Sequence, residues 1–252
     1  MEKRTPLIAG NWKMHKTCAE AVDAAKTLVH LVSAVTERDI MIAPVFTALY
    51  PVSAILDGTQ IHLGAQNIHW EDEGAFTGEV SGKMLISAGC RYVIIGHSER
   101  RQFFHESDQW VNLKIRAAVK SNLIPVMCIG ETETEYEQKN TLSVLDKQIK
   151  KGLEGSFSDS LANLVIAYEP VWAIGTGKTA KSAQAQEVHH YIRSLIEKLF
   201  GNVLAKSIRI IYGGSVKPEN ISELMNQPDI DGVLVGGASL IPETFSRIVL
   251  YQ

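Results

Sequence analysis

Side chains suited to proton transfer follow several short apolar runs of this chain. Glu169 and His97 each come within two residues of such a run, and Asn11 and Lys13 follow the first run in the sequence. A positioned carboxylate can accept a proton, and an imidazole can donate a proton and recover it. Cationic and amide donors stabilise negative charge that develops during a reaction. These residue types would together support proton abstraction from a small anionic molecule.

Two glycine-rich turns follow later apolar runs and suggest an anion site. One contains Gly213, Gly214 and Ser215, and the other contains Gly236 and Gly237. Glycine lets the backbone approach a ligand closely, because it has no Cβ. Backbone N–H groups at such turns and at helix N-termini bind phosphate. We therefore expect a phosphoryl group to be held by these turns.

Each residue also has an ordinary explanation when it is taken alone. Glu169 precedes Pro170 and could be a solvated turn residue, His97 could be a core histidine, and Lys13 could lie at a solvated edge. The paired glycines could simply form turns. Packing alone does not readily explain why all of these residues directly follow apolar runs, so the combination favours a functional site.

The elements that must position these residues alternate along the chain. Eight apolar runs rich in β-branched residues read as strands covered on both faces, at residues 7–9, 40–43, 61–64, 92–95, 124–129, 164–167, 208–211 and 232–235. Eight strand-then-helix units in about 250 residues predict a single-domain (β/α)8 barrel over residues 1–252. A doubly wound open sheet is the alternative, but residues 10–13 lack its glycine-rich dinucleotide turn. Active sites of such barrels lie at the carboxyl ends of the strands.

Helical patterns occupy the intervals between the predicted strands. Apolar residues recur at helical spacing after Thr17, after Asp108 and between Ser182 and Phe200. The residues that carry the three patterns are Val22, Ala25, Val29 and Val32; Trp110, Leu113, Ala117 and Lys120; and Val188, Ile192, Leu195, Ile196 and Leu199.

Composition argues against several classes of protein. The net charge of −3 gives no basic field for nucleic acid or for anionic lipid, and no run is long enough to cross a membrane. Three cysteines without CxxC spacing predict neither disulfides nor zinc, and the N-terminus does not read as a signal peptide, so we expect a cytoplasmic protein. The adjacent His189 and His190 point in different directions on a helix, so no metal site is predicted.

Six segments distributed over the whole chain resemble the signature segments of the triosephosphate isomerase family, and they occur in family order. A twelve-residue segment around Glu169 is the most specific of them. The segments cover residues 10–14, 74–81, 96–101, 167–178, 212–216 and 234–240. The stretch Glu133–Glu135 departs from the family pattern without touching the predicted site.

The resemblance implies interconversion of dihydroxyacetone phosphate and glyceraldehyde 3-phosphate, without a cofactor. It implies that Glu169 is the base, that His97 is the electrophile, and that Asn11 and Lys13 contact the substrate. It further implies phosphate contacts from Gly175, Ser215, Gly236 and Gly237. A helix that begins at Ser98 is expected to lower the pKa of His97 through its N–H groups.

Two loops carry further expectations. The segment from Pro170 to Lys178 reads as a lid that excludes water from a reactive intermediate. The fifteen residues from Gln66 to Val80 form a long loop with Phe76 at its tip, and loops of this length are usually functional. Because the family inserts this loop into a partner subunit, we expect an isologous homodimer with Phe76 and Thr77 in the contact.

Some questions remain open in the sequence. Glu99 shares a strand face with His97 and could pair with Lys13 or relay a proton; the pairing is favoured. The rival functions are another phosphate-binding barrel enzyme and a non-catalytic barrel with a binding role. The second rival predicts damage at Asn11, Lys13, His97 or Glu169, and all four residues are intact.

Overall fold

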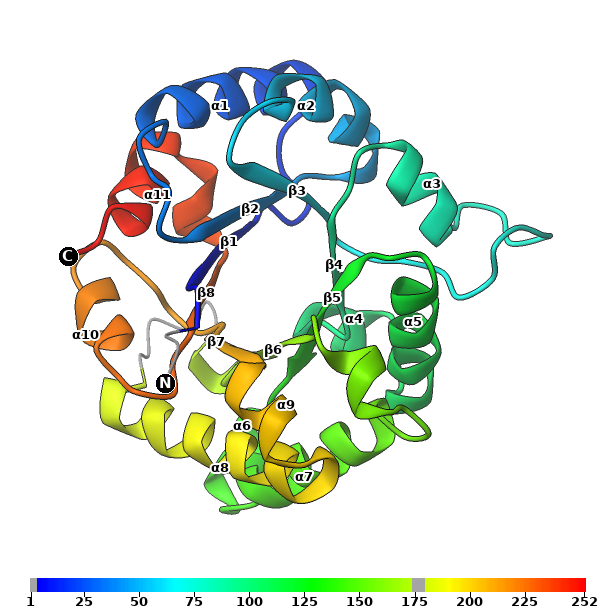
Figure 1. Ribbon diagram of the computed structural model, residues 1–252, viewed down its shortest axis with the longest axis vertical. Helices are drawn as coiled ribbons and strands as arrows, with labels where there is room; N and C mark the ends of the chain where they lie inside the picture. The colour runs from blue at the N-terminus through cyan, green and yellow to red at the C-terminus, as the bar shows by residue number, and fades with distance from the viewer. Residues whose placement is uncertain (1–3, 174–179) are drawn as a thin grey trace.

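Eight parallel strands form a closed barrel in sequence order, with β8 paired to β1. This computed structural model describes residues 4–173 and 180–252. Figure 1 looks down the barrel, with helices surrounding the strands. The strands are β1 (Leu7–Asn11), β2 (Asp39–Ala43), β3 (Ile61–Ala65), β4 (Tyr92–Ile95), β5 (Ile124–Ile129), β6 (Val165–Tyr168), β7 (Arg209–Tyr212) and β8 (Gly232–Val235).

This topology confirms the predicted barrel and rejects the open doubly wound sheet. Each of the eight apolar runs forms a strand, and predicted and observed ends agree within two residues. Closure requires hydrogen bonding between the first and last strands, and Leu7 to Gly10 pair in register with Gly232 to Val235. A closed sheet leaves no free edge.

The strands have apolar side chains on both faces because each face borders a separate core. Alternate side chains of one strand point to opposite sides of the sheet. Leu7 and Ala9 therefore lie in the barrel interior, whereas Ile8 packs in the layer between the sheet and the helices. The interior cluster is completed by Met41, Ala43, Tyr92, Ile94, Val126, Cys128, Val165, Ala167, Ile211 and Leu234.

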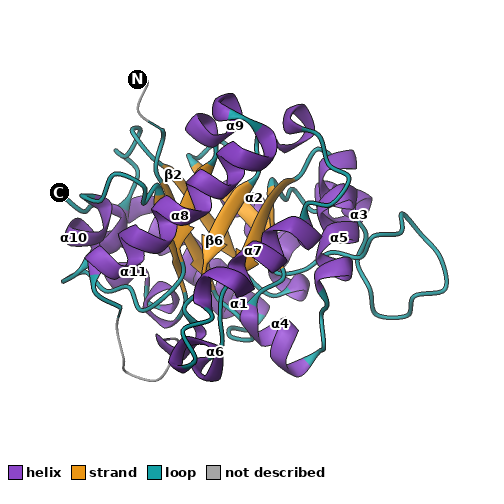
Figure 2. Cartoon of the chain, turned by 90° about the horizontal axis from the view of Figure 1, so that it is seen from below, coloured by secondary structure: helices purple, strands orange, loops and turns teal. Residues whose placement is uncertain are grey.

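Helices cover the outside of the barrel (Figure 2). The α-helices are α1 (Cys18–Leu31), α2 (Leu49–Leu56), α3 (Gly82–Ser87), α4 (Ser98–Phe103), α5 (Asp108–Lys120), α6 (Glu133–Glu137), α7 (Thr141–Gly152), α8 (Ser182–Phe200), α9 (Asn202–Ser207), α10 (Ile221–Met225) and α11 (Pro242–Val249). The described residues also form the 3₁₀ turns η1 (Phe46–Ala48), η2 (Ser158–Leu161), η3 (Val171–Ala173) and η4 (Gly237–Leu240). None of the helices within the described ranges is long and apolar enough to cross a membrane.

The helix after Thr17 begins where the sequence predicts. Thr17 and Glu20 form a reciprocal capping box at the start of α1. Helix α8 spans the predicted range from Ser182 to Phe200 and buries Ile192 among others.

Helix α5 also forms, but it packs through a different face from the one that the predicted pattern marks. Trp110 and Leu113 are exposed, whereas Val111 and Ile115 are buried. The buried face includes Lys114, whose ammonium lies 2.6 Å from a carboxylate oxygen of Glu106. A buried lysine in an ion pair hides this face from a hydrophobicity pattern.

Candidate active site

A cavity of about 280 Å³ lies among the segments that follow β1, β4, β6, β7 and β8. Asn11, Lys13, His97 and Glu169 all line it, although up to 158 positions of sequence separate them. The remaining lining residues include both predicted glycine turns: Gly213, Gly214, Ser215, Val216, Lys217, Leu234, Gly236, Gly237 and Ala238. The fold therefore brings together the predicted catalytic and phosphate-binding residues that the structure describes.

The carboxylate of Glu169 is buried and engages two hydrogen-bonding partners. Its Oε1 lies 3.0 Å from Nε2 of His97. Its Oε2 accepts a hydrogen bond of 2.9 Å from the backbone N–H of Ser98. Burial raises the pKa of Glu169, but the His97 ring, the Ser98 N–H and the Lys13 ammonium together lower it below the ordinary value. Glu169 is therefore held ionised at neutral pH, as a base must be.

Two glycines leave room for Glu169. A Cβ on Gly213 would lie 2.9 Å from Glu169 Cγ, and a Cβ on Gly130 would lie 1.8 Å from the Glu169 carbonyl oxygen. Both distances are too short for any side chain without movement of Glu169. Gly130 was not among the predicted site residues, because the close approach of β5 and β6 loops is visible only in three dimensions.

The imidazole of His97 is oriented by the helix that it precedes. His97 is the N-cap of α4, and its Nδ1 accepts a hydrogen bond of 3.2 Å from the backbone N–H of Glu99. Only a deprotonated Nδ1 can accept that bond, so the neutral ring carries its proton on Nε2. Nε2 faces Glu169 and the cavity. This geometry selects one tautomer and aims its donor at the reacting region.

The expectation of a lowered pKa at His97 is not met in this arrangement. Burial lowers the pKa of His97, yet the nearby Glu169 carboxylate raises it above the ordinary value. The nearby carboxylates thus outweigh the effect of burial on this ring. A ligand that separated the carboxylate from the ring would remove the contribution that raises this pKa.

Lys13 reaches the cavity from a strained turn. Its backbone has a positive φ of 51°, and its N–H donates to Oδ1 of Asn11 at 3.0 Å. The ammonium lies 2.7 Å from Oε1 of Glu99, as the favoured alternative for Glu99 predicts. Gln66 donates to the carbonyl of Lys13 at 2.8 Å and was not among the predicted site residues. Gln66 is the first residue of the predicted long loop, so this hydrogen bond connects the loop to the site.

The two glycine turns differ in what they can offer an anion. The N–H of Gly213 already donates to the carbonyl of Tyr168 at 2.7 Å, so it does not serve as a phosphate donor. Gly237 has open space where its Cβ would be, and a Cβ on Gly236 would contact the Lys13 side chain at 3.4 Å. The predicted anion site therefore rests on Gly214, Ser215, Gly236 and Gly237. Gly175, also predicted to contact phosphate, lies outside the described residues.

Comparison with known proteins identifies the family. A sequence model described as triosephosphate isomerase matches residues 6–252. Curated triosephosphate isomerases of Syntrophotalea carbinolica and Geobacter metallireducens are 54% and 56% identical to it over 249 residues, each covering 99% of both chains. The chain belongs to the triosephosphate isomerase family. A crystal structure of triosephosphate isomerase from Bartonella henselae superposes with a TM-score of 0.88 at 40% identity and covers 97% of each chain.

In this member of the triosephosphate isomerase family, the segment after Glu169 begins with a short 3₁₀ turn, η3. The Trp172 indole N–H donates to Oε1 of Glu131 at 2.8 Å, and the Tyr168 hydroxyl donates to the same oxygen at 3.1 Å. Glu131 is fully buried and was not among the predicted site residues. Residues 174–178 of the predicted lid lie outside the described part of the chain.

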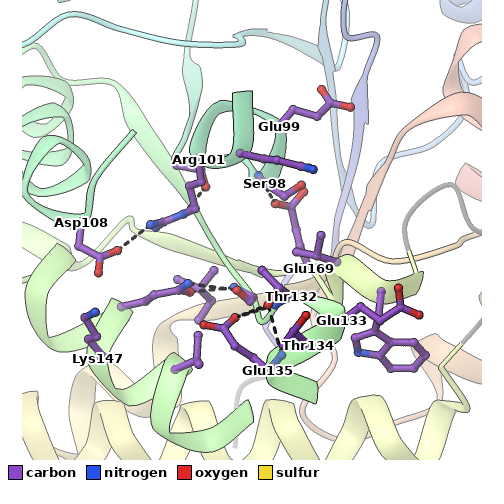
Figure 3. A pocket seen from close by; sticks show the side chains of 18 of the residues that line it. Ser98, Glu99, Arg101, Asp108, Thr132, Glu133, Thr134, Glu135, Lys147 and Glu169 are labelled. Atoms are coloured by element: carbon purple, nitrogen blue, oxygen red, sulfur yellow. Dashed lines mark hydrogen bonds and ion pairs between the residues drawn. The ribbon is translucent and has the colours of Figure 1, made fainter. Parts of the chain in front are cut away.

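A larger cavity of about 920 Å³, drawn in Figure 3, shares Glu169 with the site. Glu169 and Ser98 line it together with parts of α4, α6 and α7. Arg101, on its far wall, is anchored to Asp108 at 2.6 Å and to the Gly96 carbonyl at 2.7 Å. Glu169 thus forms part of the boundary between two cavities.

The loop from Gln66 to Val80 projects from the barrel between β3 and α3, as Figures 1 and 2 show. Phe76 remains 42% exposed, although its ring lies 4.4 Å from the ring of His69. Thr77 beside it is exposed. The shape of the loop suits a contact with another molecule, and that contact stays a prediction.

Proposed function

We propose that this chain interconverts dihydroxyacetone phosphate and D-glyceraldehyde 3-phosphate, with Glu169 as the base. Membership of the triosephosphate isomerase family supports this reaction. The observation that carries the assignment to residues is the 3.0 Å approach of the Glu169 carboxylate to the His97 imidazole, in a cavity shared with Lys13.

The proposed chemistry moves one proton between neighbouring carbons. Glu169 removes a proton from C1 of the ketone, and the C–H electron pair forms the C1–C2 double bond of an enediolate. The C2 carbonyl electrons move onto oxygen, where the Nε2–H of His97 stabilises or protonates them. Glu169 then returns its proton to C2, while the C1 hydroxyl loses its proton to replace the one that His97 gave to the C2 oxygen, and C1 becomes the carbonyl carbon. Because the substrate carbonyl accepts the electrons, the step requires no external oxidant.

Substrate entry must rearrange the pair at the centre of the site. One carboxylate oxygen of Glu169 contacts His97 and the other accepts from Ser98. The carboxylate therefore has to leave these partners to reach carbon-bound protons. Glu169 lines two cavities, so its carboxylate has space in which to exchange its contact with the His97 ring for a contact with the substrate.

We assign the positive charge of the site to Lys13, which Asn11 and Glu99 position. The ammonium is partly buried, so its interaction with an anionic intermediate is stronger than a fully hydrated lysine would provide. Asn11 fixes the backbone of Lys13 through its side-chain oxygen and retains its amide N–H₂ as a donor.

The phosphoryl group would lie against Ser215, Gly236 and Gly237, with Gly175 as a further contact from the lid. Binding of this non-reacting group can supply energy that orients the reacting carbons. The lid from Pro170 to Lys178 would exclude water and limit elimination of phosphate from the intermediate.

We further propose that the protein is a cytoplasmic homodimer. Its cysteines, Cys18, Cys90 and Cys128, are all free. Exposed Phe76 on the projecting loop provides apolar surface for an isologous contact, and Met14, close in sequence to Lys13, is 90% exposed. Insertion of the partner's loop beside Met14 would cover the side chains of both Phe76 and Met14.

A coupled assay with purified protein and glyceraldehyde 3-phosphate tests the proposed reaction. Turnover is expected without added metal or cofactor. Absence of turnover by protein with a native circular dichroism spectrum would reject the isomerase and favour a non-catalytic barrel. Phosphate binding without turnover of the triose would favour a barrel enzyme for another phosphorylated substrate.

A further inference from the structure

A separate cavity of about 310 Å³ lies between β6, α6, α7 and α8, away from the catalytic pair. Four aromatic side chains and two carboxylates are among its lining residues: Tyr136, Tyr168, Trp172, Tyr191, Glu131 and Glu187. Its described lining contains no lysine, arginine or histidine. We call this cavity the Glu131 pocket. The described lining thus combines aromatic surface with two carboxyl groups.

Glu131 forms the charged floor of the pocket. The residue is fully buried, and its Oε1 accepts the hydrogen bonds from Tyr168 and Trp172. Its Oε2 is buried and has no hydrogen-bond donor within the described residues. Burial raises the pKa of Glu131 above its ordinary value, although its own backbone N–H and the side chains of Trp172, Tyr168 and Thr141 act in the opposite direction. A buried carboxylate oxygen without a donor is costly unless a ligand supplies a partner.

Aromatic rings form the wall between Glu131 and solvent. Tyr136 stacks on Trp172 with ring centroids 4.3 Å apart and an interplanar angle of 22°. Tyr136 is 39% exposed, so this stacked pair extends from the buried floor to the surface. Tyrosine and tryptophan faces attract cations through the ring quadrupole, and such rings enclose quaternary ammonium ligands in known sites.

The rim of the pocket carries the same sign of charge as its floor. Glu187 is exposed on α8 and lines the opening. An anionic ligand would meet two carboxylates, and a neutral apolar ligand would leave Oε2 of Glu131 without a partner. A small cation with apolar substituents satisfies both the rings and the carboxylates.

We propose that the Glu131 pocket binds a small organic ammonium ion. The ammonium centre would face the Glu131 carboxylate and the aromatic rings, while Glu187 attracts the cation at the entrance. The site does not share its proposed ligand chemistry with the phosphate site, which takes an anion. It therefore adds a binding function beside the proposed isomerisation, and Trp172 belongs both to the wall of this pocket and to the proposed lid.

Binding of choline to the full chain tests this proposal, with 3,3-dimethyl-1-butanol as the neutral compound of the same shape. Isothermal titration at fixed ionic strength should show choline binding at least about tenfold more tightly than the neutral compound. Glu131→Gln should weaken choline binding about tenfold, and Tyr136→Leu should weaken it severalfold. Tyr50→Leu, at an exposed tyrosine outside the pocket, should bind choline like the unaltered protein.

The outcomes distinguish the alternatives. Equal affinity for choline and the neutral compound would show a merely apolar pocket and overturn the proposal. Undiminished choline binding by folded Glu131→Gln and Tyr136→Leu would place any choline site elsewhere. Circular dichroism establishes folding of each variant, and Tyr136→Leu keeps the test decisive if Glu131→Gln does not fold. Absence of choline binding at millimolar concentration would also reject the site.

Discussion

Gly213 lies against the side chain of Glu169: a Cβ at that position would be 2.9 Å from Glu169 Cγ. The turn after β7 therefore supports the residue after β6, in addition to its expected place beside phosphate. Positioning of a base to within a fraction of an ångström matters because proton transfer depends steeply on geometry.

Gly213→Ala is expected to displace Glu169 and to lower kcat about tenfold or more, with a smaller change in KM. Gly237→Ala is the matched comparison, because its new methyl group meets open space in the same cavity. That variant should mainly raise KM, since its methyl group would face the bound phosphate. Steady-state kinetics of both variants measure the difference, and equal kcat values for Gly213→Ala and the unaltered protein would contradict the steric role.

Glu169→Asp is expected to slow turnover roughly 100-fold or more while substrate binding stays nearly intact. The shorter side chain withdraws the carboxylate by about 1 Å from the reacting carbons. Glu154→Asp removes the same methylene from an exposed glutamate and should leave kcat unchanged. An unchanged kcat in Glu169→Asp would show that another group is the base.

Glu99→Gln distinguishes a pairing role from a proton relay. The Lys13–Glu99 pair is partly exposed, and pairs of this kind contribute at most about 1 kcal/mol. We therefore expect kcat/KM to fall less than about fivefold, with an unaltered pH profile. A loss of two orders of magnitude together with a shifted pH profile would support proton transfer through Glu99 instead.

The pH dependence of kcat/KM should report the lowered pKa of Glu169. The free enzyme's base is active only when ionised, so protonation causes the acid limb. Because the Glu169 pKa lies below its ordinary 4.5, protonation of this carboxylate should reduce kcat/KM only below about pH 4.5, and a loss at higher pH belongs to the His97 ring, whose pKa is raised. The stabilisation that this carboxylate gives the fold is likewise present above its unfolded-state pKa and is lost as pH falls through the folded value. A Glu169 carboxyl group that titrates above pH 5.5 in the folded free enzyme, followed by its side-chain carbon-13 chemical shift, would contradict the pKa direction.

Replacing Phe76 by Glu and Thr77 by Ala should produce monomers with poor activity. A charge at the tip of the projecting loop would have to be desolvated in the proposed subunit contact. Sedimentation in solution followed by assay measures both effects. Phe157→Glu introduces the same charge at a 79% exposed phenylalanine outside this loop, and it should leave the assembly unchanged. A fully active monomer would count against the role of the loop.

The chain sequence by itself determined the order of strands and the chemical types at their ends. Apolar runs of strand length, separated by helical patterns, are local properties, and the barrel follows because parallel strands need right-handed crossovers. For this reason Glu169, His97, Lys13 and Ser215 could be named from spacing and from resemblance to a family. The buried face of α5 could not be predicted in this way, because Lys114 is buried only through its ion pair with Glu106.

Only the tertiary structure decided how distant residues act on one another. The bond from Glu99 N–H to His97 Nδ1 selects the ring tautomer, and the 3.0 Å approach of Glu169 raises the His97 pKa against the effect of burial. Gly130 and Gly213 make room for Glu169, and Glu131 holds Trp172 from across the β5–β6 boundary. These relationships depend on distances and on burial, which arise when strands close into a barrel and which no periodicity of the chain encodes.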